Sequence, residues 1–264
     1  MPLVQTVLNI AANSLKRHNF DVMLEKVYAR LRDYNHARQG KAAASWCAEH
    51  AMAWADFANV LDPALWEETK KACEHLKHNA DEKLKKIRLD LGGGGHYPLL
   101  YFMTRHVNPR VVVETGVAAG WSSQAILTAL RENRNEGHLY SSDFPYFRLE
   151  NPERYIGYVV DEDLKPAWTL LIDGDRHNLP VIMEQEECVE LFHYDSDKSY
   201  SGRTFAMECL EPKLSAHTAI LFDDIQDNFH FRDMVEGRGW PFRVFSFEGK
   251  FSGLTGPFMQ NLPV

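Results

Sequence analysis

The sequence has few cysteines, and none of them is placed like a metal ligand or a redox pair. Four occur in 264 residues, and no two form a C-x-x-C pair: Cys47, Cys73, Cys188 and Cys209. This usage excludes a disulfide scaffold and is typical of reduced core thiols in an intracellular protein. The chain also has no apolar run long enough to span a bilayer, and its N-terminus lacks the basic segment of a secretory signal peptide. We therefore expect a cytoplasmic protein with no membrane partner.

The chain lacks the excess of positive charge that proteins use to bind nucleic acid. It has 29 lysines and arginines against 37 aspartates and glutamates, which gives a formal net charge of -8 and an isoelectric point near 5.8. Nucleic-acid-binding domains usually carry a basic patch that neutralises phosphates. We therefore expect no nucleic-acid partner, and the surplus carboxylates remain available to hold a metal ion.

The first third of the chain shows helical periodicity. Apolar residues recur at helical spacing over three stretches, residues 3–15, 20–31 and 46–61. Asp62-Pro63 is typical of a helix start, and Gly92–Gly95 ends the helical pattern, either as a plain linker or as a mobile loop. We place a domain boundary there, between an N-terminal helical region at 1–91 and a second domain at 92–264. The apolar faces of the first helices predict a homodimer.

The second domain alternates strand and helix patterns after a short helix at residues 98–106. Five strand patterns follow, at residues 111–113, 138–142, 168–172, 190–194 and 218–222, and a hairpin pattern covers 243–247 and 250 onward. Alternating strands and helices form mostly parallel sheets. We therefore predict an α/β fold, a Rossmann-like and mostly parallel sheet with a C-terminal antiparallel hairpin and an N-terminal helical extension.

A glycine turn follows the first of these strands. Val111–Val113 is a β-branched run without alternation, which favours a strand buried on both faces. Glu114, Gly116 and Gly120 follow, and then Ser122 and Ser123 open an apolar helix pattern. A strand, a glycine turn and a helix start form a ligand cradle. The third glycine of the dinucleotide pattern G-x-G-x-x-G is missing, which counts against an NAD-linked oxidoreductase.

Carboxylates follow all five predicted strands at the ends where parallel strands bind ligands. They are Glu114, Asp143, Asp173 with Asp175, Asp195, and Asp223 with Asp224. One or two acids would be ordinary turn chemistry, because aspartate favours turns. Asp143 follows the glycine turn by one strand–helix unit, where a nucleotide-binding sheet places an acid for the ribose hydroxyls.

Asp195, Asp223 and Asp224 are expected to converge at neighbouring strand ends. Two like charges about 4 Å apart repel by about 1–4 kcal/mol, depending on the dielectric, so the cluster needs a cation or shared protons. Oxygen ligands favour Mg²⁺, with Mn²⁺ or Ca²⁺ as other hard ions. Zinc is not expected, because we see no histidine or cysteine with ligand spacing.

The run E-x-G-x-x-x-G-[aromatic]-S from Glu114 to Ser122 resembles motif I of class I S-adenosylmethionine (SAM) methyltransferases. It is most similar to the divalent-metal-dependent O-methyltransferases of the catechol and caffeoyl-CoA type. The resemblance implies that Glu114 faces the methionine end of SAM and Ser122 its carboxylate. It also implies that Asp143 binds the ribose and that Asp175 borders the adenine.

Two further segments carry the same resemblance, which covers about residues 95–250. Asp195 to Lys198 resembles the D-x-x-K segment of these enzymes, whose aspartate holds the metal and whose lysine lies at the reacting hydroxyl. Asp223-Asp224 resembles their Asp-Asn pair, with an aspartate in place of the asparagine. The added negative charge should tighten a divalent cation.

The function that these features imply is methyl transfer from SAM to a hydroxyl group of a small molecule, assisted by a divalent metal. The metal would lower the pKa of the acceptor hydroxyl, and Lys198 would take its proton. Nearby acids raise a lysine pKa, so Lys198 is alternatively an electrostatic holder, with His193 or His230 as the base. The other functions left open are a metal-independent methyltransferase acting on nitrogen or oxygen, and a non-catalytic SAM-binding protein. We expect the acceptor pocket to be lined from the helical region and from residues 228–231.

Overall fold

The computed structural model describes residues 3–14, 33, 36, 38–87 and 89–262 of the chain. The helix predicted over residues 20–31 lies outside these residues. The first predicted helix is present as α1 (Leu3–Ser14). Among the helices that are described, none combines the length and apolar character needed to cross a membrane.

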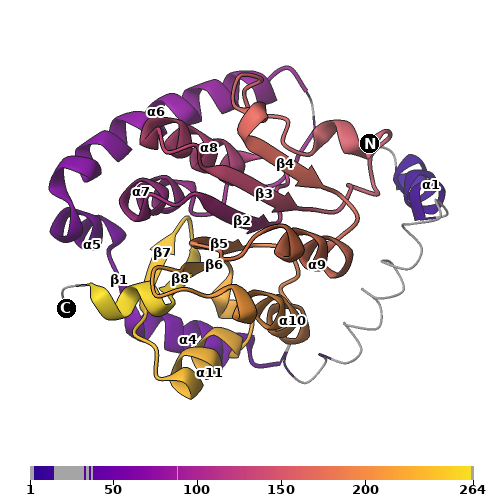
Figure 1. Ribbon diagram of the computed structural model, residues 1–264. Coiled ribbons are helices and arrows are strands. Elements are labelled where there is room, and N and C mark those ends of the chain that lie inside the picture. Colours follow the sequence, from indigo (N-terminus) through magenta and orange to yellow (C-terminus); the bar gives the residue numbers. More distant parts are fainter. Residues whose placement is uncertain (1–2, 15–32, 34–35, 37, 88, 263–264) are drawn as a thin grey trace.

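The centre of the molecule is a mixed sheet, in which the described residues form eight strands in the order β1-β7-β8-β6-β5-β2-β3-β4 (Figure 1). These strands are β1 (Ala51–Met52), β2 (Val111–Thr115), β3 (His138–Ser142), β4 (Trp168–Leu171), β5 (Leu191–Tyr194), β6 (Ala219–Phe222), β7 (Arg243–Phe247) and β8 (Lys250–Thr255). Strands β2 to β6 pair in parallel, whereas β8 runs antiparallel to both β6 and β7. The predicted α/β fold, with its C-terminal antiparallel hairpin, is confirmed.

Helices cover both faces of this sheet (Figure 1). Helices α5 (Trp54–Leu61), α6 (Pro63–Leu84), α7 (Tyr97–Val107) and α8 (Trp121–Asn133) lie on one face. Helices α4 (Gly40–His50), α9 (Asp175–Gln185), α10 (Tyr200–Leu210) and α11 (His230–Arg238) lie on the other. At the start of α6, the side chain of Asp62 accepts a hydrogen bond from Leu65 N at 2.9 Å, which confirms the predicted N-cap with Pro63 in the first turn.

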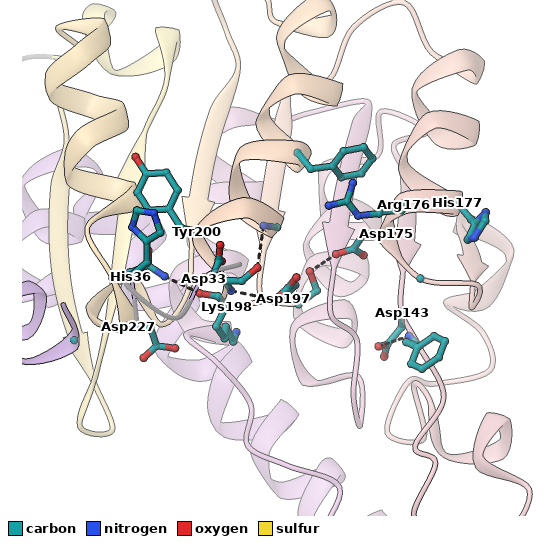
Figure 2. Close-up of a pocket in the computed structure, with 18 of the residues that line it drawn as sticks. Asp33, His36, Asp143, Asp175, Arg176, His177, Asp197, Lys198, Tyr200 and Asp227 are labelled. Atoms are coloured by element: carbon teal, nitrogen blue, oxygen red, sulfur yellow. Dashed lines mark hydrogen bonds between the residues drawn. The ribbon is translucent and has the colours of Figure 1, made fainter. Parts of the chain in front are cut away.

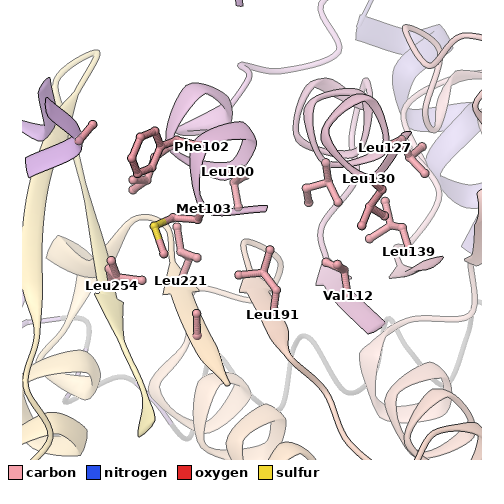
Figure 3. Packing of buried hydrophobic residues seen from close by; sticks show 14 of the residues in the cluster. Leu100, Phe102, Met103, Val112, Leu127, Leu130, Leu139, Leu191, Leu221 and Leu254 are labelled. Atoms are coloured by element: carbon pink, nitrogen blue, oxygen red, sulfur yellow. The ribbon is translucent and has the colours of Figure 1, made fainter. Parts of the chain in front are cut away.

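Successive residues of the central strands supply two separate hydrophobic cores. Val112, fully buried, packs with Leu100, Phe102 and Leu130 on the α7–α8 face (Figure 3). Val113, also fully buried, belongs to the core on the α9–α10 face. Because side chains alternate between the two faces of a strand, a strand covered on both sides needs an unbroken apolar run. This explains the valine run.

The N-terminal region contributes a strand that the helical periodicity did not predict. Ala51–Met52, expected inside a helical stretch, pair in parallel with Val244–Phe245 of β7 and form one edge of the sheet. A two-residue strand carries no readable alternation, so the sequence pattern could not reveal it. The domain boundary at residues 91 and 92 stays a prediction. The helices before it pack on the same sheet as those after it.

Candidate functional site

A cavity of about 890 Å³ lies at the carboxyl ends of β3, β4, β5 and β6. Figure 2 shows its two ends, with Asp143 at one and His36, Tyr200 and Asp227 at the other. A cavity of this size holds a ligand of several hundred daltons. Its wall is built mainly from the loops after four strands, as expected for an α/β sheet. Asp33, His36 and Gly40 close it from the N-terminal region.

Two of the predicted cofactor residues, Asp143 and Asp175, lie on the cavity wall. The Oδ2 atom of Asp143 accepts hydrogen bonds from Val117 N at 3.1 Å and Ala118 N at 2.8 Å. Burial raises the pKa of Asp143 to about 6, although its three backbone hydrogen bonds act to lower it. The Oδ1 atom of Asp175 accepts a hydrogen bond from Ser142 Oγ at 2.7 Å. Asp143 therefore links the glycine turn to the cavity.

Glu114 lies beneath this wall, within the sheet. Its Oε2 atom accepts hydrogen bonds from Ser123 Oγ at 2.6 Å and Ser141 Oγ at 2.7 Å, and its side chain is fully buried. Burial acts to raise the pKa of Glu114, but the nearby His193 ring and the hydroxyl groups of Ser122 and Ser123 outweigh it and lower the pKa. Ser122 and Ser123 thus stabilise the charged form of the Glu114 carboxylate. Gly120 is the N-cap of α8. The predicted contacts of Glu114 and Ser122 with SAM remain untested expectations, and neither residue lines the cavity.

The two motif glycines bring backbone segments into close contact. Gly116 has a φ angle of +82°, and a Cβ atom there would lie 2.5 Å from the backbone oxygen of Asp195. Gly120 has a φ angle of +93°, and its Cβ would lie 2.7 Å from Gly157 Cα. Only glycine combines these conformations with such approaches. The turn is therefore fixed against the loop that carries Asp195.

Asp195 and Asp223 come together at adjacent strand ends, as predicted. Asp195 N donates to Thr115 O and Asp223 N donates to Tyr194 O, each at 2.9 Å, so both residues continue the parallel ladder. With His193 they form a group whose ligand atoms all lie within 4.8 Å of one another. A Cβ at Gly95 would lie 2.5 Å from Asp223 Oδ2 and 3.5 Å from Asp195 Oδ2. The absent side chain therefore lets both carboxylates approach the backbone at Gly95. Two carboxylates and an imidazole gathered this closely fit a divalent cation.

Asp224, the third predicted metal ligand, faces two lysines. Its Oδ2 atom lies 3.0 Å from Lys250 Nζ and 3.2 Å from Lys198 Nζ. Burial acts to raise the pKa of Asp224, but these two ammonium groups outweigh it, so the pKa lies below its ordinary value. Its φ angle of 53° turns the backbone at the end of β6. Asp224 balances the lysine charges and is not part of the group formed by His193, Asp195 and Asp223.

Lys198 lies on the cavity wall and contacts the carboxylates of Asp195 and Asp224. Its Nζ atom donates to the carboxylate of Asp195 and, at 2.8 Å, to the backbone oxygen of the same residue. Burial lowers the pKa of Lys198, outweighing the opposite effect of Asp224 and Asp223. The acids act to raise this pKa, as the sequence predicted, but desolvation is the larger effect and the net shift of the pKa is downward.

His230, the other predicted catalytic residue, lies in the core beside the cavity wall and does not line the cavity. Its ring packs edge-on against Tyr200, with centroids 5.0 Å apart, and also contacts Phe222. Burial, aided by the positive charge of Arg203, lowers the pKa of His230 to about 3. The ring is therefore neutral at physiological pH, and its role as a base has no support from its position.

Sequence reasoning missed two residues of this region. His193 was considered only as a base, and the view that no histidine has ligand spacing is wrong, because His193 lies beside Asp195 and Asp223. The available signal was the H-x-D spacing of His193 and Asp195, which places both side chains on one side of a strand. Arg203, fully buried in α10, donates to the backbone oxygens of Asp223 and Asp224. An arginine in a mixed helix gives no sequence signal of such burial.

Comparison with known proteins agrees with this arrangement. Residues 113–225 match the family model described as a methyltransferase domain. This part of the chain is similar to a methyltransferase domain. It contains Glu114, Asp143, Asp175, Asp195, Lys198, Asp223 and Asp224. The resemblance to class I methyltransferases is confirmed.

Solved structures share the fold of about two thirds of this chain. A putative O-methyltransferase from Klebsiella pneumoniae is similar with a TM-score of 0.53 and 12% identity, over 69% of this chain and 88% of that chain. The O-methyltransferase TomG from Streptomyces achromogenes, involved in tomaymycin synthesis and solved with SAM, gives 0.52 and 15%, over 69% and 88%. A putative caffeoyl-CoA O-methyltransferase from Staphylococcus aureus gives 0.50 and 11%, over 72% and 99%. A search of curated proteins found no match.

Proposed function

We propose that this protein transfers a methyl group from SAM to a hydroxyl group of a small molecule, with a divalent cation beside the acceptor. The observation that carries the proposal is a single cavity lined by Asp143 and Asp175 toward one end and by Lys198 and Tyr200 toward the other (Figure 2). A transferase must hold donor and acceptor together in line. One continuous cavity with two chemically different ends suits that requirement.

The end near Asp143 suits the nucleoside of SAM. Asp143 is a half-buried carboxylate at the second strand end of the fold, where an acid can accept hydrogen bonds from both ribose hydroxyls. Phe144 adds an aromatic surface at the same end, and Asp175 lies on the wall between the two ends. Gly116 and Gly120 support this binding indirectly, by fixing the turn whose N–H groups Asp143 accepts.

The end near Lys198 suits the acceptor. Burial lowers the pKa of Lys198, so its ammonium group gives up a proton more readily than an exposed lysine does. As the neutral amine, Lys198 takes the proton from the acceptor hydroxyl. Tyr200 and His36 stack with ring centroids 4.3 Å apart and form an aromatic wall beside it. Acceptor shape is thus set partly by the N-terminal region and by Asn228.

Asp195 and Asp223 are the proposed carboxylate ligands of the cation, and Mg²⁺ is the first candidate on the carboxylates alone. When bound, the cation supplies Lewis-acid stabilisation of the acceptor oxygen. Asp224 stays paired with Lys198 and Lys250 and keeps the lysines in place.

A calorimetric titration with S-adenosylhomocysteine tests the cofactor half of this proposal. We expect the wild-type chain to bind this product, and Asp143→Ala to weaken binding at least about tenfold because two ribose hydroxyls lose a charged acceptor. A matched control is Asp163→Ala, since Asp163 is exposed and pairs with Arg131 on the surface. Unchanged affinity in Asp143→Ala, or no binding by the wild type, contradicts the proposal.

One observation favours a second candidate, a metal-independent methyltransferase. The ammonium group of Lys198 already contacts Asp195 and Asp224, so the acid cluster contains a positive charge of its own. Methyl transfer that continues at full rate in excess EDTA would select this candidate. Loss of transfer with EDTA and its recovery on adding a divalent cation would exclude it.

A further inference from the structure

We propose that His193 is a nitrogen ligand of this cation site, that Glu114 orients its ring, and that the site therefore prefers a divalent transition-metal ion such as Mn²⁺ over Mg²⁺. The inference rests on the cation site of the proposed function and specifies its chemistry. It does not depend on the identity of the methyl acceptor.

The strand register places the three side chains together. Glu114 of β2 and His193 of β5 are paired residues of neighbouring parallel strands, so their side chains leave the same face of the sheet. His193 precedes Asp195 by two positions, which sets both on one side of the chain. The imidazole therefore lies between a buried carboxylate and the acid cluster.

Glu114 and His193 face each other with unsatisfied atoms. Glu114 Oε1 and His193 Nδ1 lie 3.6 Å apart, and both are buried without a hydrogen-bond partner among the described residues. The other carboxylate oxygen, Oε2, is committed to Ser123 and Ser141. Unsatisfied buried polar atoms cost about 1–3 kcal/mol each, so this arrangement needs an explanation.

A metal-bound histidine supplies that explanation. Histidines that ligate metals almost always donate their second ring N–H to a carboxylate or carbonyl, which fixes the tautomer and the ring orientation. A proton on Nδ1 directed at Glu114 leaves Nε2 with the lone pair that a cation needs. Binding through Nε2 makes Nδ1–H a stronger donor, so the Nδ1–Oε1 contact shortens to a hydrogen bond.

The donor set determines which ion is preferred. Asp195 and Asp223 offer carboxylate oxygens, and Gly95 lies close to both of them. Adding an imidazole nitrogen shifts preference from Mg²⁺, which favours oxygen, toward first-row transition ions. If Glu114 and His193 formed only a buried ion pair, replacing His193 would not change which cation the site prefers. Measuring the cation preference therefore distinguishes an ion pair from a metal-bound histidine.

The test is to titrate Mn²⁺ and Mg²⁺ separately into the full chain by calorimetry. We expect wild type to bind Mn²⁺ at least about tenfold more tightly than Mg²⁺, and His193→Asn to reduce that ratio at least about fivefold. Glu114→Gln should weaken Mn²⁺ binding by about 10–100-fold, as loss of such a supporting carboxylate does elsewhere. The matched control is His217→Asn, because His217 is exposed and precedes the opposite end of β6.

A spectroscopic measurement on wild type avoids any effect of the variants on folding. Pulsed electron paramagnetic resonance of the Mn²⁺-bound chain should show coupling to one imidazole ¹⁴N nucleus. Bound Mn²⁺ without nitrogen coupling, or an unchanged Mn²⁺/Mg²⁺ ratio in His193→Asn, overturns the inference but leaves the cation of the proposed function standing. Failure of both ions to bind overturns the inference together with the metal part of the proposed function.

Discussion

Arg203 binds the backbone oxygen of Asp224 at 2.7 Å, although its guanidinium is fully buried. The same group donates to Asp223 O at 3.2 Å and to Asn228 Oδ1 at 3.2 Å. Asn228 in turn donates to Lys198 O at 2.9 Å. One buried arginine therefore connects Asp223 and Asp224, which follow β6, with the loop after β5 that carries Lys198. It binds the backbone of Asp224, which has a left-handed conformation that few residues other than glycine adopt.

Replacing Arg203 should cost stability as well as site geometry. Arg203→Met removes the side-chain donor of the backbone oxygens of Asp223 and Asp224, and Asp224 O keeps only its 3.2 Å hydrogen bond from Asp227 N. A buried oxygen that loses its donor costs about 1–3 kcal/mol. We expect urea unfolding to show a loss of about 2–4 kcal/mol on that basis. The control Arg131→Met removes a half-exposed arginine paired with Asp163 and should change stability by less than about 0.5 kcal/mol. Equal effects of the two variants would refute this role for Arg203.

Lys198 and Lys250 contact the same carboxylate but should differ in their effect on catalysis. Lys198→Met should lower the turnover rate by about 10²–10⁴, because it removes the proposed base. Lys250, whose side chain is 60% exposed, does not line the main cavity, so Lys250→Met should lower the rate less than about tenfold. Turnover at saturating SAM measures both. The proposed base is excluded if the two variants lose activity equally.

Asp143 should reduce stability at neutral pH. Its pKa is about 6 in the folded protein because of burial, whereas an unfolded aspartate titrates near about 3.9. Between about pH 4 and 6 the folded state binds more protons, so the stabilising contribution present below pH 4 is lost as pH rises toward 6. Asp143→Asn removes that loss. We compare the free energies of unfolding of the variant and of wild type. The variant's advantage in this free energy should be about 1–3 kcal/mol larger at pH 7.5 than at pH 4.

Urea unfolding of both proteins at the two pH values measures this difference. A stability difference that does not change with pH would show that Asp143 ionises normally in the folded protein.

Gly95 should be needed for cation binding and not merely for the shape of its loop. A Cβ there would lie 2.5 Å from Asp223 Oδ2, at a φ angle of +57°. Gly92 also has a positive φ angle, +93°, but a Cβ there meets no atom within 4 Å. Gly95→Ala and Gly92→Ala therefore share the backbone strain, and only the first places a methyl group beside the carboxylate.

We expect Gly95→Ala to weaken cation binding at least about tenfold in calorimetry. A tenfold loss of affinity corresponds to about 1.4 kcal/mol, and a steric conflict of this size costs more than that. Gly92→Ala should bind as wild type does. Equal affinities of the two variants would place the cation away from Gly95.

Much of the fold could be predicted from the sequence, because the central strands are buried on both faces and such strands need unbroken apolar runs, which the sequence shows. The valine run at Val111–Val113 predicts β2 for this reason, and the acid after each parallel strand predicts the edge where Asp143, Asp195 and Asp223 lie. Parallel strands all end at the same edge of the sheet. A sequence pattern that predicts where the strands end therefore also predicts which residues lie together at that edge.

What the sequence could not predict depends on register and on single backbone angles. The pairing of Glu114 with His193 follows from the register between β2 and β5, which no local pattern encodes. The direction of Asp224 toward Lys198 and Lys250 follows from one left-handed residue. His230 was predicted as a base from its residue type, and its burial in the core could not be read from the sequence.

The short strand β1 has a consequence for dissecting this chain. Ala51–Met52 cover the outer edge of β7 along Val244–Phe245, so a fragment that starts at Gly92 would expose unpaired N–H and C=O groups of a largely apolar strand. Bare strand edges recruit other chains and promote aggregation. Cutting at the glycine run would therefore yield insoluble material, even though residues 113–225, which match the methyltransferase family model, would be intact.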